Sequence, residues 1–161
     1  MQEREIKLTF TEYPSDADLR PEDASLLKKA RSTTRDAYAP YSHFRVGAAA
    51  VLANGEIITG ANQENASFPA GICAERTLLS VAAARFPGIP IEALAISYYN
   101  EQGPADRPIA PCGICRQSLK EFEDRTRHPI RLVLGGQTGP VYVIPRSGAL
   151  LPVGFGAEDL A

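Results

Sequence analysis

One strong turn signal, Asn54-Gly55, separates two segments that alternate apolar and small residues. Asn-Gly is favoured in two-residue hairpin loops, where both positions need a positive φ. RVGAAAVLA precedes this turn and EIITGA follows it. The sequence therefore predicts an antiparallel hairpin, and the many alanines in its first strand predict that another element packs closely against it.

Apolar residues at helical spacing predict helices on both sides of the hairpin. The first can begin at Pro21, because proline costs little in the first turn of a helix, and Pro40 ends it. Pro87-Gly88 ends the second. The predicted helices span 21–39, 73–86 and 112–125.

The remaining apolar segments predict strands. EALAISYY has the continuous apolar character of a buried strand, IRLVLG and PVYVIP predict two closing strands, and IKLTF alternates like a short edge strand. No linker or change of composition divides the 161 residues, so we expect a single domain over 1–161. The order of elements predicts an α/β fold with three layers, in which a mixed β-sheet of about five strands is flanked by helices.

Charge and hydropathy limit the expected partners. The net charge is −2, which disfavours nucleic acid and other polyanions and fits a small neutral ligand better. No apolar stretch is long enough to cross a bilayer, so no membrane contact is expected. The first residues, MQEREIKLTF, do not have the pattern of a secretory signal. We therefore expect a cytoplasmic protein whose thiols stay reduced.

The chain has three cysteines, Cys73, Cys112 and Cys115, and an odd number cannot all pair in intramolecular disulfides. Cys112 and Cys115 lie three apart at a predicted helix start, so their sulfurs point the same way. Cys73 begins another predicted helix, and the N–H groups at such ends favour thiolates. Four interpretations stay open at this point: inert buried thiols, a redox dithiol, a structural zinc site, or a catalytic zinc site with three cysteines and an open position.

Glu75 follows Cys73 by two residues. A glutamate in the first turn of a helix is most often a surface charge that offsets the helix dipole. Beside a zinc ion held by three thiolates, however, the carboxylate could take a proton from water and return it to a substrate. The Arg76 guanidinium could offset the negative charge of the thiolates, or be an ordinary surface arginine. Neither His43 nor His128 lies in a metal-ligand spacing.

Two segments, Cys73-Ala74-Glu75-Arg76 and Pro111-Cys112-Gly113-Ile114-Cys115-Arg116-Gln117, resemble the zinc-binding signature of the cytidine deaminase superfamily, in its three-cysteine form that acts on free nucleosides. Three more segments match in the same order: YSHFRVGA, GANQENAS and FGAEDL. The resemblance spans residues 22 to 160. It implies a zinc-dependent hydrolase, with one zinc ion per chain, that deaminates cytidine and 2′-deoxycytidine in pyrimidine salvage.

The resemblance also implies roles for single residues. The three cysteines would bind the zinc ion, and Glu75 would be the catalytic proton carrier. Asn62 and Glu64 would hold the ribose 3′-hydroxyl. Phe44 would pack on the pyrimidine, and the backbone N–H of Ala74 would contact its 2-oxo group.

Members of this type form homotetramers, so the resemblance implies that assembly here. Phe155 would then lie over a neighbouring subunit's active site. Phe68 stands where many members have tyrosine, and Ala157 replaces the usual proline of the C-terminal motif. Residues 1–20 form an N-terminal extension beyond compact members, which could add an edge strand. These departures concern assembly rather than the metal or the proton carrier.

Three rival functions share parts of this pattern. A deaminase of another small aminopyrimidine, such as blasticidin S, would carry the same zinc motif, but Asn62 and Glu64 favour a substrate with ribose. A structural zinc module would need a fourth protein ligand, which the remaining residues do not offer. A dithiol redox protein would keep its function without metal.

Overall fold

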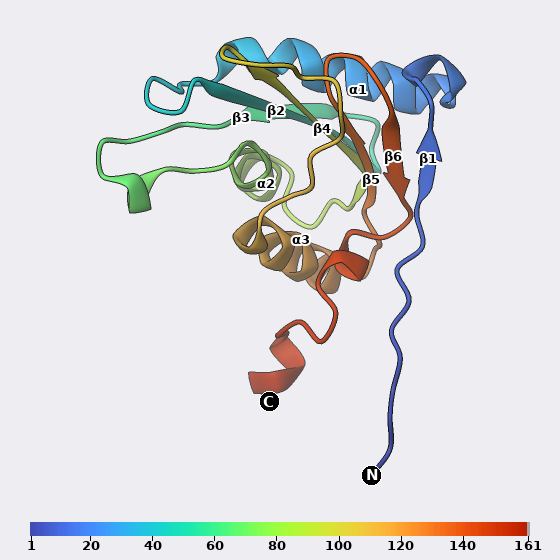
Figure 1. Cartoon of the computed structure of the whole chain (residues 1–161). Helices are drawn as coiled ribbons and strands as arrows, with labels where there is room; N and C mark the ends of the chain where they lie inside the picture. Colours follow the sequence, from blue (N-terminus) through green and yellow to red (C-terminus); the bar gives the residue numbers. More distant parts are fainter. Residues whose placement is uncertain (161) are drawn as a thin grey trace.

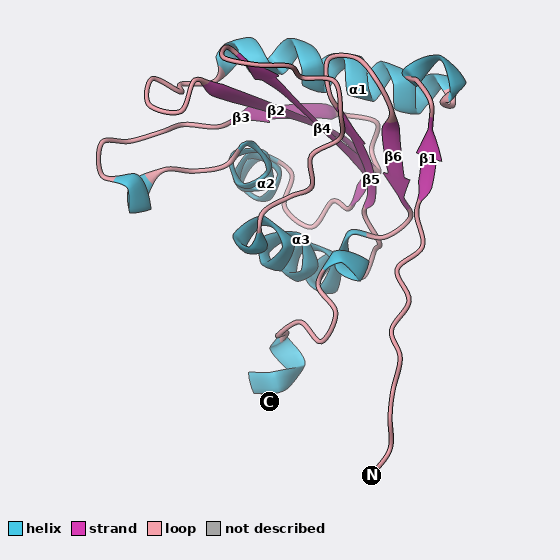
Figure 2. Ribbon diagram, in the orientation of Figure 1, coloured by secondary structure: helices cyan, strands magenta, loops and turns pink. Residues whose placement is uncertain are grey.

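The computed structural model describes residues 1–160, and within them six strands form one mixed sheet (Figures 1 and 2). The strands lie in the order β1-β6-β5-β4-β2-β3. β4 and β5 run parallel, with a helix in the connection between them, and the other neighbouring pairs are antiparallel. The strands are β1 (Thr11–Tyr13), β2 (Phe44–Leu52), β3 (Ile57–Ala61), β4 (Ile91–Asn100), β5 (Arg131–Gly135) and β6 (Val141–Ile144).

Helices cover both faces of the sheet. α1 (Pro21–Thr33) lies on one face, and α2 (Ala74–Arg85) and α3 (Gly113–Thr126) lie on the other (Figure 1). This arrangement confirms the α/β fold of three layers, with one strand more than the five or so expected. In the described part of the chain, no helix is both long and apolar enough to cross a membrane.

Each face of the sheet has its own apolar cluster. Beneath α1, Leu27 and Ala30 pack with alanines of β2 and β4. Beneath α2 and α3, Leu78 and Leu119 pack with larger side chains of the sheet such as Ile96. Because β4 is buried on both faces, its sequence is continuously apolar, as the pattern EALAISYY predicted.

The close packing predicted for the alanine-rich hairpin is confirmed at two glycines. A Cβ atom on Gly47 would lie 2.3 Å from the carbonyl oxygen of Ala30 in α1. A Cβ on Gly60 would lie 2.5 Å from the carbonyl oxygen of Ala74 and 2.5 Å from the backbone nitrogen of Leu78. The first turn of α2, which follows Cys73, therefore sits directly on the backbone of β3.

The predicted edge strand over residues 6–10 is wrong, because the strand lies at Thr11–Tyr13 instead. β1 pairs only with β6, and Pro145, which follows β6, has no N–H to continue the ladder. The alternating side chains of residues 6–10 are exposed, although the Phe10 ring packs 4.8 Å from that of Tyr142. The N-terminal extension thus adds an edge strand, but a later and shorter one.

The predicted end of the first helix at residue 39 is also wrong. α1 ends at Thr33, and a 3-10 turn follows over Thr34–Asp36. The hydroxyl of Thr33 donates to the carbonyl of Lys29 and that of Thr34 to the carbonyl of Arg31, and such local bonds compete with continuation of the helix. The other predicted helices and strands begin and end close to their expected positions.

Candidate active site

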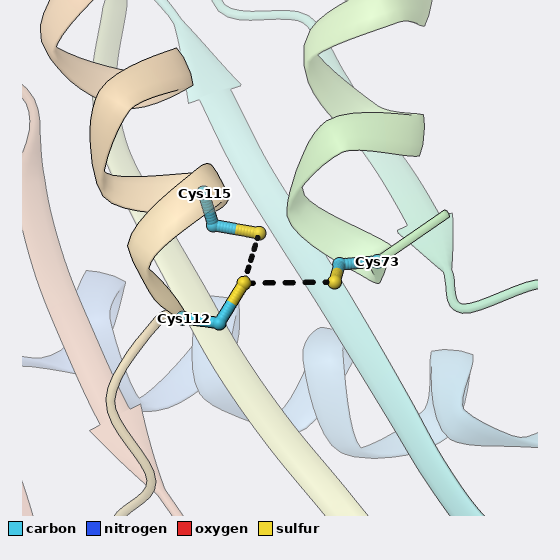
Figure 3. A group of neighbouring side chains, drawn as sticks. All are labelled: Cys73, Cys112 and Cys115. Carbon is cyan, nitrogen blue, oxygen red and sulfur yellow. Dashed lines mark hydrogen bonds between the residues drawn. The ribbon is translucent and has the colours of Figure 1, made fainter. Parts of the chain in front are cut away.

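The three cysteines converge where α2 and α3 begin (Figure 3). Cys73 is the N-cap residue of α2, Cys112 is the N-cap residue of α3, and Cys115 lies in the first turn of α3. The Sγ atoms of Cys73 and Cys112 are 3.8 Å apart, and those of Cys112 and Cys115 are 3.5 Å apart. All three sulfurs lie within 4.8 Å of one another. The fold therefore brings together thiols from two distant segments of sequence.

The sulfur positions fit a zinc ion. Tetrahedral zinc with bonds of about 2.3 Å to sulfur places two sulfurs about 3.8 Å apart. The observed separations of 3.8 and 3.5 Å agree with that geometry. The cluster offers three ligand atoms, whereas structural zinc sites are closed by four. Three ligands leave a position for water or substrate.

The thiols have the electrostatics that a metal site requires. A hydrogen bond with Cys115 lowers the pKa of Cys73 to about 6, against the opposing effects of burial and of the Glu75 charge. The positive charge of Arg76 acts in the same direction as that hydrogen bond. The interaction with Cys73, together with burial, raises the pKa of Cys115. A thiolate is therefore accessible near neutral pH, and thiolates are the form that binds zinc.

Glu75 is the second residue of α2, and only 5% of it is exposed. This rules out the surface charge that its position in the first turn would ordinarily suggest. Burial raises the pKa of its carboxyl, although its own backbone N–H and the Cys115 thiol partly oppose the shift. A buried carboxyl whose pKa lies closer to neutrality can both accept and return a proton.

A cavity of about 540 Å³ opens beside Cys73. Its lining includes two of the residues expected to hold a sugar, Asn62 and Glu64, and the exposed ring of Phe68. Ala74 is fully buried where α2 begins. The structure thus places the two predicted sugar residues in one cavity with Cys73, whose sulfur lies within 4.8 Å of those of Cys112 and Cys115.

Asn62 has a structural role that sequence reasoning missed. Its Oδ1 accepts a hydrogen bond from the backbone N–H of Val46 at 2.7 Å, and its Nδ2 donates to the carbonyl of Phe44 at 3.0 Å. These two bonds hold the start of β2, where the ring of Phe44 stacks on Tyr98 at a centroid distance of 4.8 Å. One N–H of the amide is left, so Asn62 can donate a hydrogen bond to a substrate while it holds β2.

Glu64 holds the loop that precedes β2. Its Oε2 accepts hydrogen bonds from the backbone N–H groups of Tyr41 at 2.9 Å and Ser42 at 3.3 Å. Slight burial raises the pKa of this carboxyl, but hydrogen bonds from the Ser42 side chain and from these N–H groups outweigh it and lower the pKa. Glu64 therefore remains a charged acceptor in the cavity.

Arg116 belongs to the signature segment, but the sequence analysis gave it no role of its own. Its Nε donates to the carbonyl of Pro111 at 2.8 Å, and its Nη1 donates to the carbonyl of Leu150 at 3.3 Å. These bonds tie the loop before Cys112 to the C-terminal part of the chain. The one available signal was its position directly after the second cysteine of the C-x-x-C segment.

Of the predicted site residues, Asn62, Glu64 and Cys73 line the cavity, and the others lie outside its lining: Phe44, Ala74, Glu75, Arg76, Cys112, Cys115 and Phe155. Phe155 is 55% exposed on the C-terminal tail, where its carbonyl accepts a hydrogen bond from Gln117 at 3.0 Å. The side chain of Arg76 makes no hydrogen bond within the described chain, and it lines a separate hollow between α2 and α3. Its expected contact with the thiolates is therefore electrostatic rather than direct.

Comparison with known proteins agrees with this geometry. The model of the cytidine and deoxycytidylate deaminase zinc-binding region matches residues 20–128. A cytidine deaminase of Halalkalibacterium halodurans is 38% identical over 135 residues, which are 84% of this chain and 95% of that protein. A cytidine deaminase of Mycobacterium tuberculosis is 36% identical over 143 residues, 86% of this chain and 93% of that protein.

The fold is shared as well. The crystal structure of cytidine deaminase from Burkholderia pseudomallei superposes with a TM-score of 0.71 at 39% identity, covering 81% of this chain and 97% of that one. The family match includes the three cysteines and Glu75, and the thiol cluster is suited to the zinc ion for which the family is described. The chain therefore belongs to the zinc-binding cytidine and deoxycytidylate deaminase family, and its cofactor is zinc.

Proposed function

We propose that this protein converts cytidine and 2′-deoxycytidine to uridine and 2′-deoxyuridine by hydrolysis, with release of ammonia. The observation that carries the proposal is the buried Glu75 carboxyl beside three thiols, next to a cavity lined by Asn62 and Glu64. The similarity to proteins named cytidine deaminase supports the same substrate class.

Cys73, Cys112 and Cys115 would hold the ion, which supplies a water whose pKa is lowered towards neutrality. Glu75 takes the proton that this water loses as its oxygen adds to C4 of the pyrimidine. It delivers that proton to N3, and it then carries the proton of the new C4 hydroxyl to the amine, which leaves as ammonia while the C4 carbonyl forms. One buried carboxyl can serve each step, because burial raises its pKa and so makes the protonated form easier to reach.

The cavity orients the nucleoside through one hydrogen-bond donor and one hydrogen-bond acceptor. Asn62 has an N–H to donate to the ribose 3′-hydroxyl, and Glu64 can only accept from it. The backbone N–H of Ala74 would contact the 2-oxo group, and Phe44, held by Asn62 and stacked on Tyr98, would pack on the ring. A hydroxyl that both donates and accepts satisfies this pair, which favours substrates with a 3′-hydroxyl.

The assembly and setting follow from the same proposal. We place the protein in pyrimidine salvage, in the cytoplasm, as a homotetramer in which Phe155 reaches a neighbouring subunit's site. The support for this assembly is the exposed ring of Phe155, which lies outside the cavity of its own chain, and the ring of Phe68 at 75% exposure on the cavity wall.

The direct experiment measures metal content and cytidine turnover on one purified sample, following the absorbance lost as uridine forms. About one zinc per chain with turnover is the expected result. Zinc without turnover of cytidine would direct the search to other aminopyrimidines, with free cytosine and blasticidin S as the first alternatives. An active protein without zinc would refute the mechanism.

We expect Glu64→Gln to lower kcat/KM for cytidine by about tenfold or more, mainly through a higher KM. The single oxygen of glutamine would have to serve two backbone N–H groups and the hydroxyl together. The measurement is steady-state kinetics with cytidine and with 3′-deoxycytidine, and Glu56→Gln in the hairpin turn is the matched control. On 3′-deoxycytidine the variant and the wild type should perform alike. An equal loss on both substrates would show that Glu64 acts only by holding the loop.

A further inference from the structure

A second cavity, of about 650 Å³, opens on the face of the sheet that α1 covers, opposite the face on which α2 and α3 hold the thiols (Figure 1). We call it the α1 cleft. Its lining includes the exposed ring of Tyr99 and the side chain of Gln137. It also includes four cationic side chains and no carboxylate: Lys28, Arg31, Arg35 and Arg45.

Two of these cations are fixed by ion pairs at the edge of the cleft. Arg31 pairs with Asp16 and donates to the carbonyl of Gly136 at 2.8 Å. Arg45 pairs with Glu101 and donates to the carbonyl of Ala37 at 2.8 Å. Each of these guanidinium groups is thereby held in place while its charge is balanced.

The other two cations have no such partner. Lys28 and Arg35 are exposed, and neither forms an ion pair with another residue in the described part of the chain. The α1 cleft therefore carries two uncompensated positive charges, although the whole chain has a net charge of −2. The net charge of the whole sequence does not reveal this local excess of positive charge.

Helix stability does not account for the cluster. Lys28 and Arg31 lie three apart in α1, where like charges at this spacing destabilise a helix, and Arg35 follows in the 3-10 turn after α1. The helix dipole favours cations only in the last turn, so it can explain the arginines but not Lys28. Arg45 comes from β2 and lies opposite Tyr99 of β4 in the sheet register. Three elements, α1, the 3-10 turn after it and β2, thus direct cations to one place beside an exposed aromatic ring.

We propose that the α1 cleft binds a nucleotide, with its phosphates at Lys28 and Arg35 and its base against Tyr99. Ammonium and guanidinium groups are the usual partners of phosphate oxygens, and an exposed tyrosine ring stacks on bases. The cleft has room for one small ligand. This site is separate from the nucleoside cavity and involves none of its residues.

The proposal is tested by calorimetric titration of the full-length protein with three probes: ATP, inorganic tripolyphosphate and adenosine. We expect ATP to bind more tightly than tripolyphosphate, adenosine to bind far more weakly than either, and added salt to weaken binding of the two anions. Lys28→Ala/Arg35→Ala should raise the Kd for ATP and the Kd for tripolyphosphate by about tenfold or more. Tyr99→Ala should lower the affinity for ATP to that for tripolyphosphate, and it should leave the affinity for tripolyphosphate unchanged.

The matched control is Arg4→Ala/Lys7→Ala, which removes two exposed positive charges outside the cleft. Its affinities should stay within about twofold of the wild type, because screened distant charges contribute little. An equal loss in the control would show general attraction rather than a site. Failure of ATP and tripolyphosphate to bind at millimolar concentration would overturn the proposal. Equal affinity for the two anions, with no effect of Tyr99→Ala, would overturn the assignment of a nucleotide.

Discussion

Glu75→Gln is expected to keep its zinc and to lose about 10²–10⁴ in kcat. The amide has nearly the same shape as the carboxyl, so the first turn of α2 and the thiols of the cluster should stay in place. It cannot take a proton from water, however, and no other carboxyl is expected to replace it, since the cavity's Glu64 is bound to the loop before β2. The loss should therefore appear in turnover and not in metal content.

The measurement combines kcat for cytidine with the zinc content and melting temperature of the same preparation. Glu121→Gln is the control, because Glu121 is an exposed carboxylate on α3 outside the cavity. The control should retain wild-type kcat. Glu75→Ala should behave like Glu75→Gln, with some loss of stability from the space left in a buried position. A variant of Glu75 with more than about a tenth of wild-type turnover would contradict the role as proton carrier.

Cys115→Ser is expected to lower the zinc content from about one per chain to less than about a tenth after dialysis, and to abolish turnover with it. A serine hydroxyl is a far weaker zinc ligand than a thiolate, and two remaining cysteines do not make a three-ligand site. Cys115 is fully buried, so no solvent-exposed group can take over its place. Added zinc should not restore the activity of this variant.

Chelation of the wild-type protein supplies the comparison. Removal of zinc should abolish turnover while most of the fold remains, because the two apolar clusters lie on the faces of the sheet and do not depend on the ion. Zinc added back should restore the activity of the wild type. Ser118→Ala, one turn beyond Cys115, is the control for an effect on α3 itself. Turnover that survives without zinc would instead support a dithiol function, and unfolding on chelation would support a structural site.

The placement of the cysteines at helix starts was predictable from the sequence. Cys73 and Cys112 precede apolar patterns of helical period, so both had to stand near N-terminal ends. Local signals also predicted most elements, because Asn54-Gly55 and Pro87-Gly88 restrict the backbone without help from distant residues. The resemblance to a deaminase family added the roles of Asn62 and Glu64, which local signals would have assigned to a turn.

Two predictions were wrong: the strand over residues 6–10, which needed a partner strand, and the end of the first helix at residue 39. Residues 6–10 alternate as a strand does, but β6 ends at Ile144 and Pro145 cannot extend the pairing. The spacing of apolar residues continued the first helix to residue 39, but Thr33 and Thr34 turn their hydroxyls to the backbone near its end. Neither outcome is visible in the period of the apolar residues alone.

The sequence by itself determined the elements, the three thiols and the carboxyl that follows the first of them. The tertiary structure alone decided that Glu75 is buried, that Asn62 holds the strand on which Phe44 lies, and that cations of α1 and β2 meet in one cleft. Spacing along the chain fixes which residues share a face of one element. Burial, hydrogen-bond partners and local charge depend on which elements the fold packs together, and these contacts join residues far apart in sequence.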